Sequence, residues 1–255
     1  MTADPLPSTD PLHAHGADTR GVVPGNVRHP PWLLISAAAL AIAILLVGAV
    51  GASIDHGWQF GVERQIMLWT RHGTMHGAAI GPAWLKAAMI DITALGGVTV
   101  LTLVTVIVAL FLALRQLWLT MLLGLGGTIS GAIAVAVAKS LVARPRPDVV
   151  DHLVQVSSAS FPSGHATSSA IVYLTLAALV MQIVPGRVVR GYIIVVAALI
   201  VGAIGCSRVY LGVHWPSDVL IGWSFGALWA LMWWGIGASI RIRRAGQSVL
   251  KSSQS

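Results

Sequence analysis

The stretch "VTVLTLVTVIVALFLALRQLWLTMLLGLGGTISGAIAVAVA", residues 98–138, decides the fold class, because it holds two apolar runs separated by little more than Arg115 and Gln116. A helix crosses the hydrocarbon core of a bilayer with about 20 predominantly apolar residues. Val98–Leu114 and Leu117–Ala138 fit that description. The short break between them predicts a tight antiparallel helical hairpin.

The rest of the chain repeats this pattern. Of the 255 residues, 56% are hydrophobic and 10% are charged, against about 25% charged in an average soluble domain. One apolar run, Tyr192–Gly205, is short by itself, so it needs part of the following "CSRVYLG" to cross a bilayer. We therefore predict an all-α, polytopic membrane protein with six transmembrane helices. The four further apolar runs are Trp32–Ile54, Ala166–Val184, Tyr192–Gly205 and Val219–Ile240.

Polar ends delimit a single predicted domain. Residues 1–30 contain five prolines and no apolar stretch, which predicts a disordered cytoplasmic tail and not a signal peptide. Residues 31–245 hold the six spans, and residues 246–255 form a polar cytoplasmic tail. Between the first two spans, apolar residues of the segment 55–97 alternate with Glu63, Arg64 and Arg71, as in an amphipathic segment that lies in the headgroup layer.

The distribution of Lys and Arg predicts the orientation in the membrane. With the N-terminus inside, the inner segments hold nine of the 16 Lys and Arg residues, and three of the seven outer ones belong to the clusters described next. The positive-inside rule then predicts an integral plasma (bacterial inner) membrane protein with both termini in the cytoplasm. The net charge of +7 is spread over loops and helix ends, which does not favour nucleic-acid binding.

Three polar clusters fall at the predicted outer ends of spans: "KSLVARPRP" (139–147), "FPSGHATSSA" (161–170) and "SRVYLGVHWPSD" (207–218). Each has a plain explanation by itself. The cations could reach for headgroups, Ser163 could cap a helix, and His214 and Asp218 could form a structural (i, i+4) pair. Those explanations leave open why all three clusters lie on one side of the membrane, which favours a common site facing the periplasm or cell exterior.

The chemistry of the clusters points to phosphate. Lys139, Arg146 and Arg208 supply three cations, and guanidinium groups match phosphate oxygens two at a time. The backbone N–H groups of Ser163, Gly164 and His165 lie at a helix start, where an anion is favoured. Gly164 also lets the backbone approach the anion closely.

The two histidines suggest a division of labour. Asp218 lies one helical turn after His214, so its carboxylate can hold one ring nitrogen protonated and leave the other free to attack phosphorus. His165 remains as the acid that protonates the leaving group and then as the base that activates water.

Neither a metal nor another cofactor is predicted. No carboxylate cluster for magnesium is visible in the sequence, and His72 and His76 have the spacing of only half a zinc site without an evident third ligand. Arg144, two residues before Arg146, is expected to contact the headgroup layer rather than a diphosphate.

The clusters resemble the signature of the type-2 phosphatidic acid phosphatase superfamily. Lys139 precedes Arg146 and Pro147 by the family spacing, Pro162–His165 reads Pro-Ser-Gly-His, and "SRVYLGVHWPSD" supplies Ser-Arg, His and Asp. The resemblance implies a metal-independent lipid phosphatase with a phosphohistidine intermediate. It leaves the substrate open among phosphatidic acid, phosphatidylglycerol phosphate, undecaprenyl pyrophosphate and lipid A phosphates, and some members transfer the phosphoryl group to another lipid.

Two other classes fit less well. A soluble vanadium haloperoxidase has a similar anion pocket, but six spans argue against it. A membrane transporter would be expected to carry ionisable groups near mid-span and inverted repeats, and neither pattern is evident in the sequence.

Overall fold

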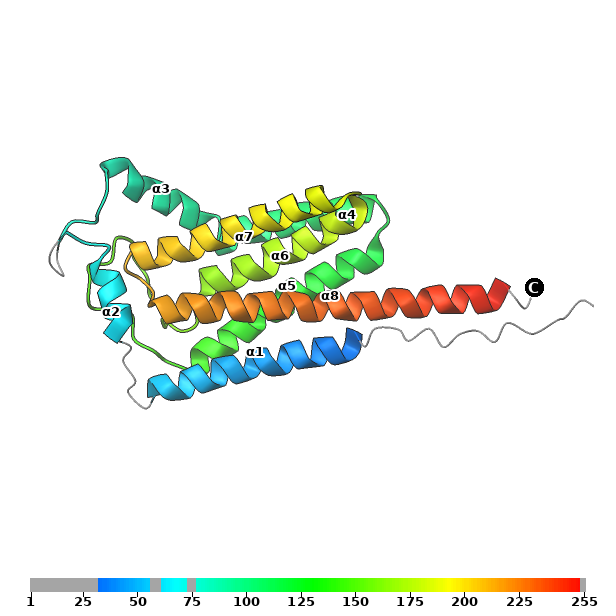
Figure 1. Ribbon diagram of the computed structural model, residues 1–255, viewed down its shortest axis with the longest axis horizontal. Coiled ribbons are helices and arrows are strands. Elements are labelled where there is room, and N and C mark those ends of the chain that lie inside the picture. The colour runs from blue at the N-terminus through cyan, green and yellow to red at the C-terminus, as the bar shows by residue number, and fades with distance from the viewer. Residues whose placement is uncertain (1–31, 56–60, 73–76, 253–255) are drawn as a thin grey trace, which may run out of the picture. The chain divides into compact units, whose positions relative to one another are not determined.

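The computed structural model describes residues 32–55, 61–72 and 77–252, which form eight α-helices and no β-strand. Figure 1 shows the helices in chain order. They are α1 (Trp32–Asp55), α2 (Gly61–Leu68), α3 (Ala83–Ala94), α4 (Val98–Leu114), α5 (Trp118–Leu141), α6 (Gly164–Ile183), α7 (Arg187–Tyr210) and α8 (Pro216–Ser252).

The predicted all-α membrane fold is confirmed for the described residues. Helices α1, α5, α6, α7 and α8 are long and apolar enough to span a bilayer. Helix α4 has the predicted bounds but passes this test only together with α3, to which it is joined through a 47° bend. The structure therefore contains five candidate spans, or six if α3 and α4 count as one, and the number six stays a prediction.

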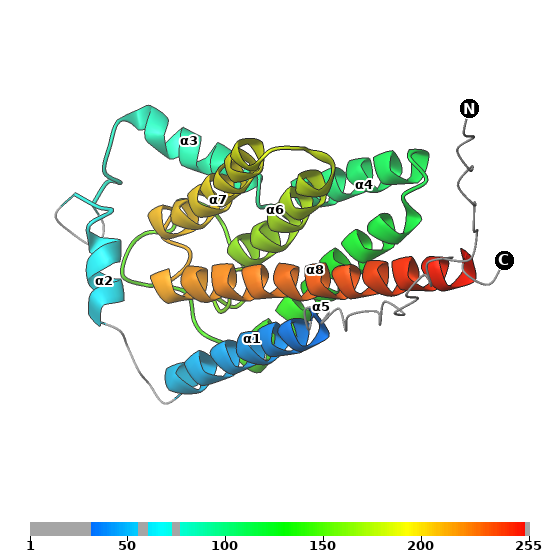
Figure 2. The same cartoon turned by 45° about the vertical axis from the view of Figure 1, so that its right-hand side comes forward.

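Helices α6 and α8 form the centre of the bundle. Helix α8 packs against α1, α5, α6 and α7, and α6 packs against α4, α5, α7 and α8, as both views of the ribbon show (Figures 1 and 2). The close approach of α6 and α8 requires Gly226, because a Cβ there would lie 2.5 Å from that of Ala170 and 2.7 Å from the carbonyl oxygen of Thr167. Small residues permit such helix contacts in membranes, where van der Waals packing replaces the hydrophobic effect.

The start of α8 is fixed by its own first residues. Pro216 is the first helical residue, a position where its missing N–H costs nothing. Asp218, two residues later, turns back so that its Oδ2 accepts the Trp215 backbone N–H at 3.0 Å. This is half of a capping box, and it places a carboxylate in the first turn, where the helix dipole favours negative charge.

Helix α2 does not carry all its polar residues on an outer face. Glu63 and Met67, one turn apart, are the buried residues of α2, and Arg71 beyond its end is also buried. Val62 and Trp69 are exposed instead. The amphipathic segment in the headgroup layer therefore stays a prediction, and the structure shows that Glu63 and Arg71, two of its charged residues, are buried.

The predicted C-terminal tail also begins as helix, because α8 continues through residues 246–252. The predicted N-terminal tail, residues 1–30, lies outside the described residues.

Candidate active site

The three polar clusters meet at one end of the bundle. The C-terminal ends of α5 and α7 and the first turns of α6 and α8 lie at the same end in Figure 1. The segment between α5 and α6 covers this end, where Val149 and Val150 pack on Met67 of α2, and the Leu153 N–H donates to the Leu211 carbonyl at 3.0 Å. Residues from distant parts of the chain are thereby held around His214.

His214 and Asp218 form a buried pair. The Nδ1 atom of His214 lies 3.5 Å from Oδ2 of Asp218, and the exposed fractions of the two side chains are 2% and 0%. The Ser160 hydroxyl donates to the same carboxylate oxygen and lies 3.4 Å from Nδ1. On the opposite edge of the ring, Nε2 lies 3.4 Å from the Nη1 atom of Arg146.

This geometry selects a tautomer for His214. Because the carboxylate can only accept, the proton belongs on Nδ1, which leaves a lone pair on Nε2. Burial, together with the charges of Arg208 and Arg146, lowers the pKa of His214 to about 4, even though the hydrogen bond to Asp218 and the charge of Asp218 act in the opposite direction. His214 is therefore neutral at neutral pH, with its free nitrogen directed at the cations.

The three predicted cations converge without carboxylate partners among the described residues. Lys139 Nζ donates to the Ala159 carbonyl at 2.7 Å, and Arg146 donates to the carbonyls of Ser158 and Val213 at 2.8 and 2.6 Å. Their charges, together with that of Arg208, all act on His165. Neutral acceptors thus hold the cations in place, and none of the three forms an ion pair with a described carboxylate.

Arg208 and Ser163 each bury a polar atom that lacks a partner. Arg208 is 4% exposed, its Nη1 donates to the Thr93 hydroxyl at 3.2 Å, and its Nε has no hydrogen-bond partner. The Ser163 hydroxyl is likewise buried and unpaired, although Ser163 is the N-cap residue of α6. Buried polar groups are normally satisfied, so these atoms are suited to a ligand.

The start of α6 departs from the predicted cradle in one respect. The Ser163 N–H donates to the Asp218 carbonyl at 3.1 Å, so it cannot also serve an anion, contrary to expectation. The N–H groups of Gly164 and His165 precede the first intrahelical bond of α6, from the Thr167 N–H to the Ser163 carbonyl. A side chain at Gly164 would point toward Lys139, since its Cβ would lie 3.6 Å from Cε.

Arg144 is not at the headgroup layer. It is 7% exposed and lies between two buried carboxylates, with Nη1 donating to Asp218 Oδ1 at 2.6 Å and Nη2 donating to Glu63 Oε2 at 2.9 Å. The expectation was wrong because residues 144 and 146 of the "RPRP" segment point in different directions. Arg146 faces His214, and Arg144 lies behind Asp218.

Sequence reasoning missed several residues of this site. Arg144 and Ser160 donate to Asp218. Thr93 accepts from Arg208, and Glu63 reaches the site only through Arg144. The doubled Arg-Pro of "RPRP" was the one local signal, since it placed a second arginine beside the first.

The described residues contain no group of three His, Cys, Asp or Glu side chains suited to a metal ion. His72 is exposed, and His76, the other half of the considered zinc pair, lies outside the described ranges.

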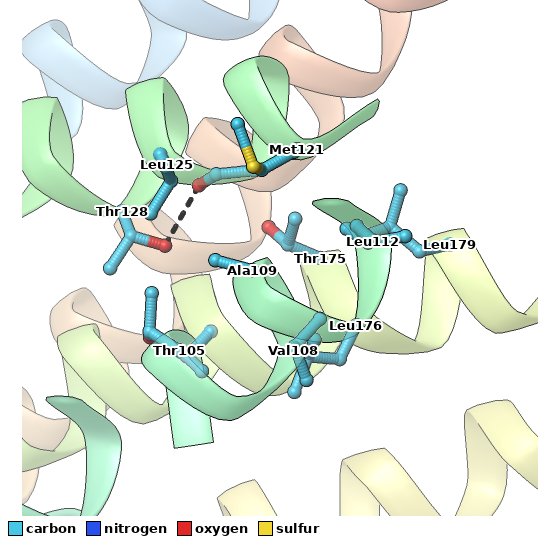
Figure 3. Close-up of a pocket in the computed structure, with 12 residues that line it drawn as sticks. Thr105, Val108, Ala109, Leu112, Met121, Leu125, Thr128, Thr175, Leu176 and Leu179 are labelled. Carbon is cyan, nitrogen blue, oxygen red and sulfur yellow. Dashed lines mark hydrogen bonds between the residues drawn. The ribbon is translucent and has the colours of Figure 1, made fainter. Parts of the chain in front are cut away.

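A separate, narrow groove lies among α4, α5 and α6 (Figure 3). Its labelled lining is aliphatic side chains, Met121 and three threonines, one of which, Thr128, donates to the Gly124 carbonyl at 3.0 Å. Its lining contains no charged side chain, so this groove is distinct from the cluster of cations around His214.

Fold and site together define a polytopic membrane protein with a cluster of cations around a buried histidine at one end of its helices. Residues 117–241 match the family model of the PAP2 superfamily, and the chain belongs to this superfamily.

Its relatives are phosphatases of lipids. The chain is 38% identical over 149 residues to phosphatidylglycerophosphatase B of Bacillus subtilis, covering 57% of this chain and 71% of that protein. It is 35% identical over 169 residues to the decaprenylphosphoryl-5-phosphoribose phosphatase of Mycobacterium tuberculosis, covering 65% and 78%. The crystal structure of a transmembrane PAP2-type phosphatidylglycerolphosphate phosphatase from Bacillus subtilis superposes with a TM-score of 0.67 at 29% identity, covering 80% of this chain and 96% of that one.

Proposed function

We propose that the protein is an integral membrane phosphatase that removes the terminal phosphate of a lipid monoester or diphosphate through a phosphohistidine on His214. One observation carries the proposal. A buried neutral imidazole has Asp218 on Nδ1 and a cation on Nε2, with two unpaired polar atoms nearby on Arg208 and Ser163. Such a site is arranged for a nucleophilic attack on a bound anion.

The first step forms the bond between Nε2 of His214 and phosphorus, and it breaks the bond from phosphorus to the lipid oxygen. His165 donates the proton that the leaving oxygen takes up. The imidazole becomes positively charged, and Asp218 stabilises that charge through Nδ1–H. Lys139, Arg146 and Arg208 neutralise the phosphoryl oxygens throughout, so that no metal ion is required.

The second step returns the enzyme to its starting state. His165, now neutral, takes a proton from water as the water oxygen attacks phosphorus. Inorganic phosphate leaves, and Nε2 regains its lone pair. If another lipid hydroxyl replaces water, the same two steps transfer the phosphoryl group between lipids, which is the alternative within this family.

The site and the relatives support a substrate class. The site offers three cations for one phosphoryl group, and the relatives are named for phosphatidylglycerophosphate and decaprenylphosphoryl-5-phosphoribose. We propose a terminal phosphate on a membrane lipid, to be chosen among phosphatidic acid, phosphatidylglycerol phosphate, decaprenylphosphoryl-5-phosphoribose, undecaprenyl pyrophosphate and lipid A phosphate.

The decisive experiment offers these lipids in parallel to the detergent-purified protein, with and without EDTA, and measures released phosphate. We expect rapid release from one lipid, unaffected by EDTA. Release restored only by magnesium or zinc would contradict the metal-free mechanism. Absence of release from every lipid, with transport of one of them in proteoliposomes, would favour the transporter.

Rapid acid and base quenching tests the roles of the histidines. His214→Ala should retain no acid-labile, base-stable phosphate. His165→Ala should be crippled with lipids but recover part of its rate with a nitrophenyl phosphate, whose leaving group needs no proton. Trapping of phosphate on His214→Ala but never on His165→Ala would reverse the assignment.

The proposed orientation, with the site facing the periplasm or cell exterior, can be tested in a Cys206→Ser background. Ser157→Cys, beside the site, should react with an impermeant thiol reagent in intact cells. Arg115→Cys, in the connection between α4 and α5, should react only after lysis. The opposite pattern would invert the topology.

A further inference from the structure

The two carboxylate oxygens of Asp218 contact different groups. Oδ2 accepts the Ser160 hydroxyl and the Trp215 N–H and lies at His214 Nδ1. Oδ1 is held by Nη1 of Arg144 at 2.6 Å. Rotation of Asp218 about its side chain would break both sets of contacts, so Arg144 fixes the orientation in which Oδ2 faces the imidazole.

Arg144 is itself held by Glu63. Its Nη2 donates to Glu63 Oε2 at 2.9 Å, while Glu63 Oε1 accepts the Ser217 backbone N–H at 2.8 Å. Glu63 thereby ties α2 to the first turn of α8, directly beside Asp218. The positive charge of Arg144 is shared between two buried carboxylates, and its guanidinium lies over the Trp215 ring at 5.1 Å from the centroid.

Only an arginine suits this position. The planar guanidinium reaches Asp218 with one nitrogen and Glu63 with the other, whereas a lysine offers a single point charge. Stacking on Trp215 adds a contact that a planar cation makes well.

We propose that Glu63 and Arg144 are positioning residues that hold Asp218 against His214, so that docking of α2 onto α8 is required for phosphorylation of His214. This inference rests on the proposed function. The side-chain hydrogen bonds of Glu63 and Arg144 go to Asp218, Ser217 and each other, not to Lys139, Arg146 or Arg208, so each acts through Asp218. Without Arg144, the carboxylates of Glu63 and Asp218 would share a dry site with no cation between them.

Arg71 provides a matched control. It is another buried arginine at this end of the molecule, 4% exposed, but it donates to the backbone carbonyls of Tyr210 and Asp151 at 3.0 Å each. Arg71→Met removes a buried guanidinium of the same size without touching Asp218.

The experiment measures single-turnover phosphorylation with a nitrophenyl phosphate, and the melting temperature, for each variant. Arg144→Met should lower the phosphorylation rate about 100-fold, as expected when a catalytic group is misplaced, with KM nearly unchanged. Arg144→Lys should rescue only part of this loss. Arg71→Met should lower the melting temperature, because the carbonyls of Tyr210 and Asp151 lose their donor. It should leave the phosphorylation rate of the folded protein within about threefold, since Arg71 has no contact with Asp218.

The double variant separates positioning from simple loss of structure. Glu63→Gln alone should slow phosphorylation about tenfold, because an amide NH₂ then faces Arg144. In the Arg144→Met background the same change should cost nothing or restore activity, because it removes a buried charge that has lost its partner. Losses that multiply in the double variant, or an Arg144→Met protein that is unstable but phosphorylated at the normal rate, would overturn the inference.

Failure of the proposed function has a different signature. If the wild-type protein is never phosphorylated and releases no phosphate from any lipid, that function fails. The melting temperatures still test the contact in that case. Arg144→Met should destabilise an Asp218→Asn protein less than the wild type, and equal effects in both backgrounds would show that Arg144 does not hold Asp218.

Discussion

Cations lie on both sides of the His214–Asp218 pair, and the two sides differ in how the protein compensates their charge. Behind Asp218, Arg144 forms ion pairs with Glu63 and Asp218. In front of His214, Lys139, Arg146 and Arg208 contact only neutral groups among the described residues, and Arg208 keeps a buried, unpaired Nε. A buried charge without a partner lowers stability. The difference supports the proposed function, in which a bound phosphate supplies the missing negative charge on the front side.

The largest expected effect is on the front side. Arg208→Met should lower the rate of lipid hydrolysis about 10³-fold, because it removes a preorganised donor from the phosphoryl oxygens. It should leave the melting temperature unchanged or raise it, because an uncompensated buried charge is removed. Kinetics and thermal unfolding in the same detergent check both. A large fall in the melting temperature of Arg208→Met would contradict the proposed difference between the two sides.

On the back side, removal of the arginine should lower the stability of the protein, in contrast to Arg208→Met. Arg144→Met should lower the free energy of unfolding by about 3 kcal/mol, the cost of leaving buried carboxylates unpaired. Thermal unfolding followed by tryptophan fluorescence measures this, with Arg208→Met as the partner variant. Equal destabilisation by the two variants would show that the two sides do not differ.

Binding of an added anion should distinguish the two sides by its effect on stability, without any catalytic turnover. Orthovanadate at about 100 times its Kd should stabilise the wild-type protein by about 2.7 kcal/mol. Arg208→Met should lose this stabilisation, and Arg71→Met should keep it. Equal stabilisation of Arg208→Met would place the anion elsewhere.

The smallest effect concerns pH. Because the pKa of His214 falls to about 4 in the folded protein, from about 6.5 in the unfolded chain, the neutral imidazole stabilises the fold fully above pH 6.5. That contribution declines as the pH falls toward 4. Between pH 7.5 and pH 5 the free energy of unfolding of the wild type should fall by about 2 kcal/mol more than that of His214→Gln. Parallel pH dependences for the two proteins would contradict a neutral buried His214.

The sequence predicted the positions of the helices better than the contacts between distant segments of the chain. The two apolar runs around Arg115 and Gln116 became α4 and α5, with α4 at the predicted bounds. The (i, i+4) spacing of His214 and Asp218 also sufficed to predict their contact, since residues one helical turn apart are neighbours. Local spacing is informative wherever both residues lie on one helix or at its start.

Contacts between distant segments had no such signal. Glu63 and Arg144 are 81 residues apart, and the pattern around Glu63 looked like that of a surface helix. The Ser163 N–H was expected to bind an anion, but α8 brings the Asp218 carbonyl to it. Arg208 depends on Thr93, at the end of α3 near the bend that no periodicity indicated.

Apolar length and motif spacing alone determined that this chain is a helical membrane protein with His214, Asp218 and three cations at or shortly after helix ends. The reason is that burial in lipid and helical periodicity act on neighbouring residues. Only the tertiary structure decided that Arg144 pairs with Asp218 while Arg146 faces His214. The two arginines are alike in sequence. Their surroundings differ because α2 brings a carboxylate to one of them, whereas the loop before α8 brings a carbonyl and an imidazole to the other.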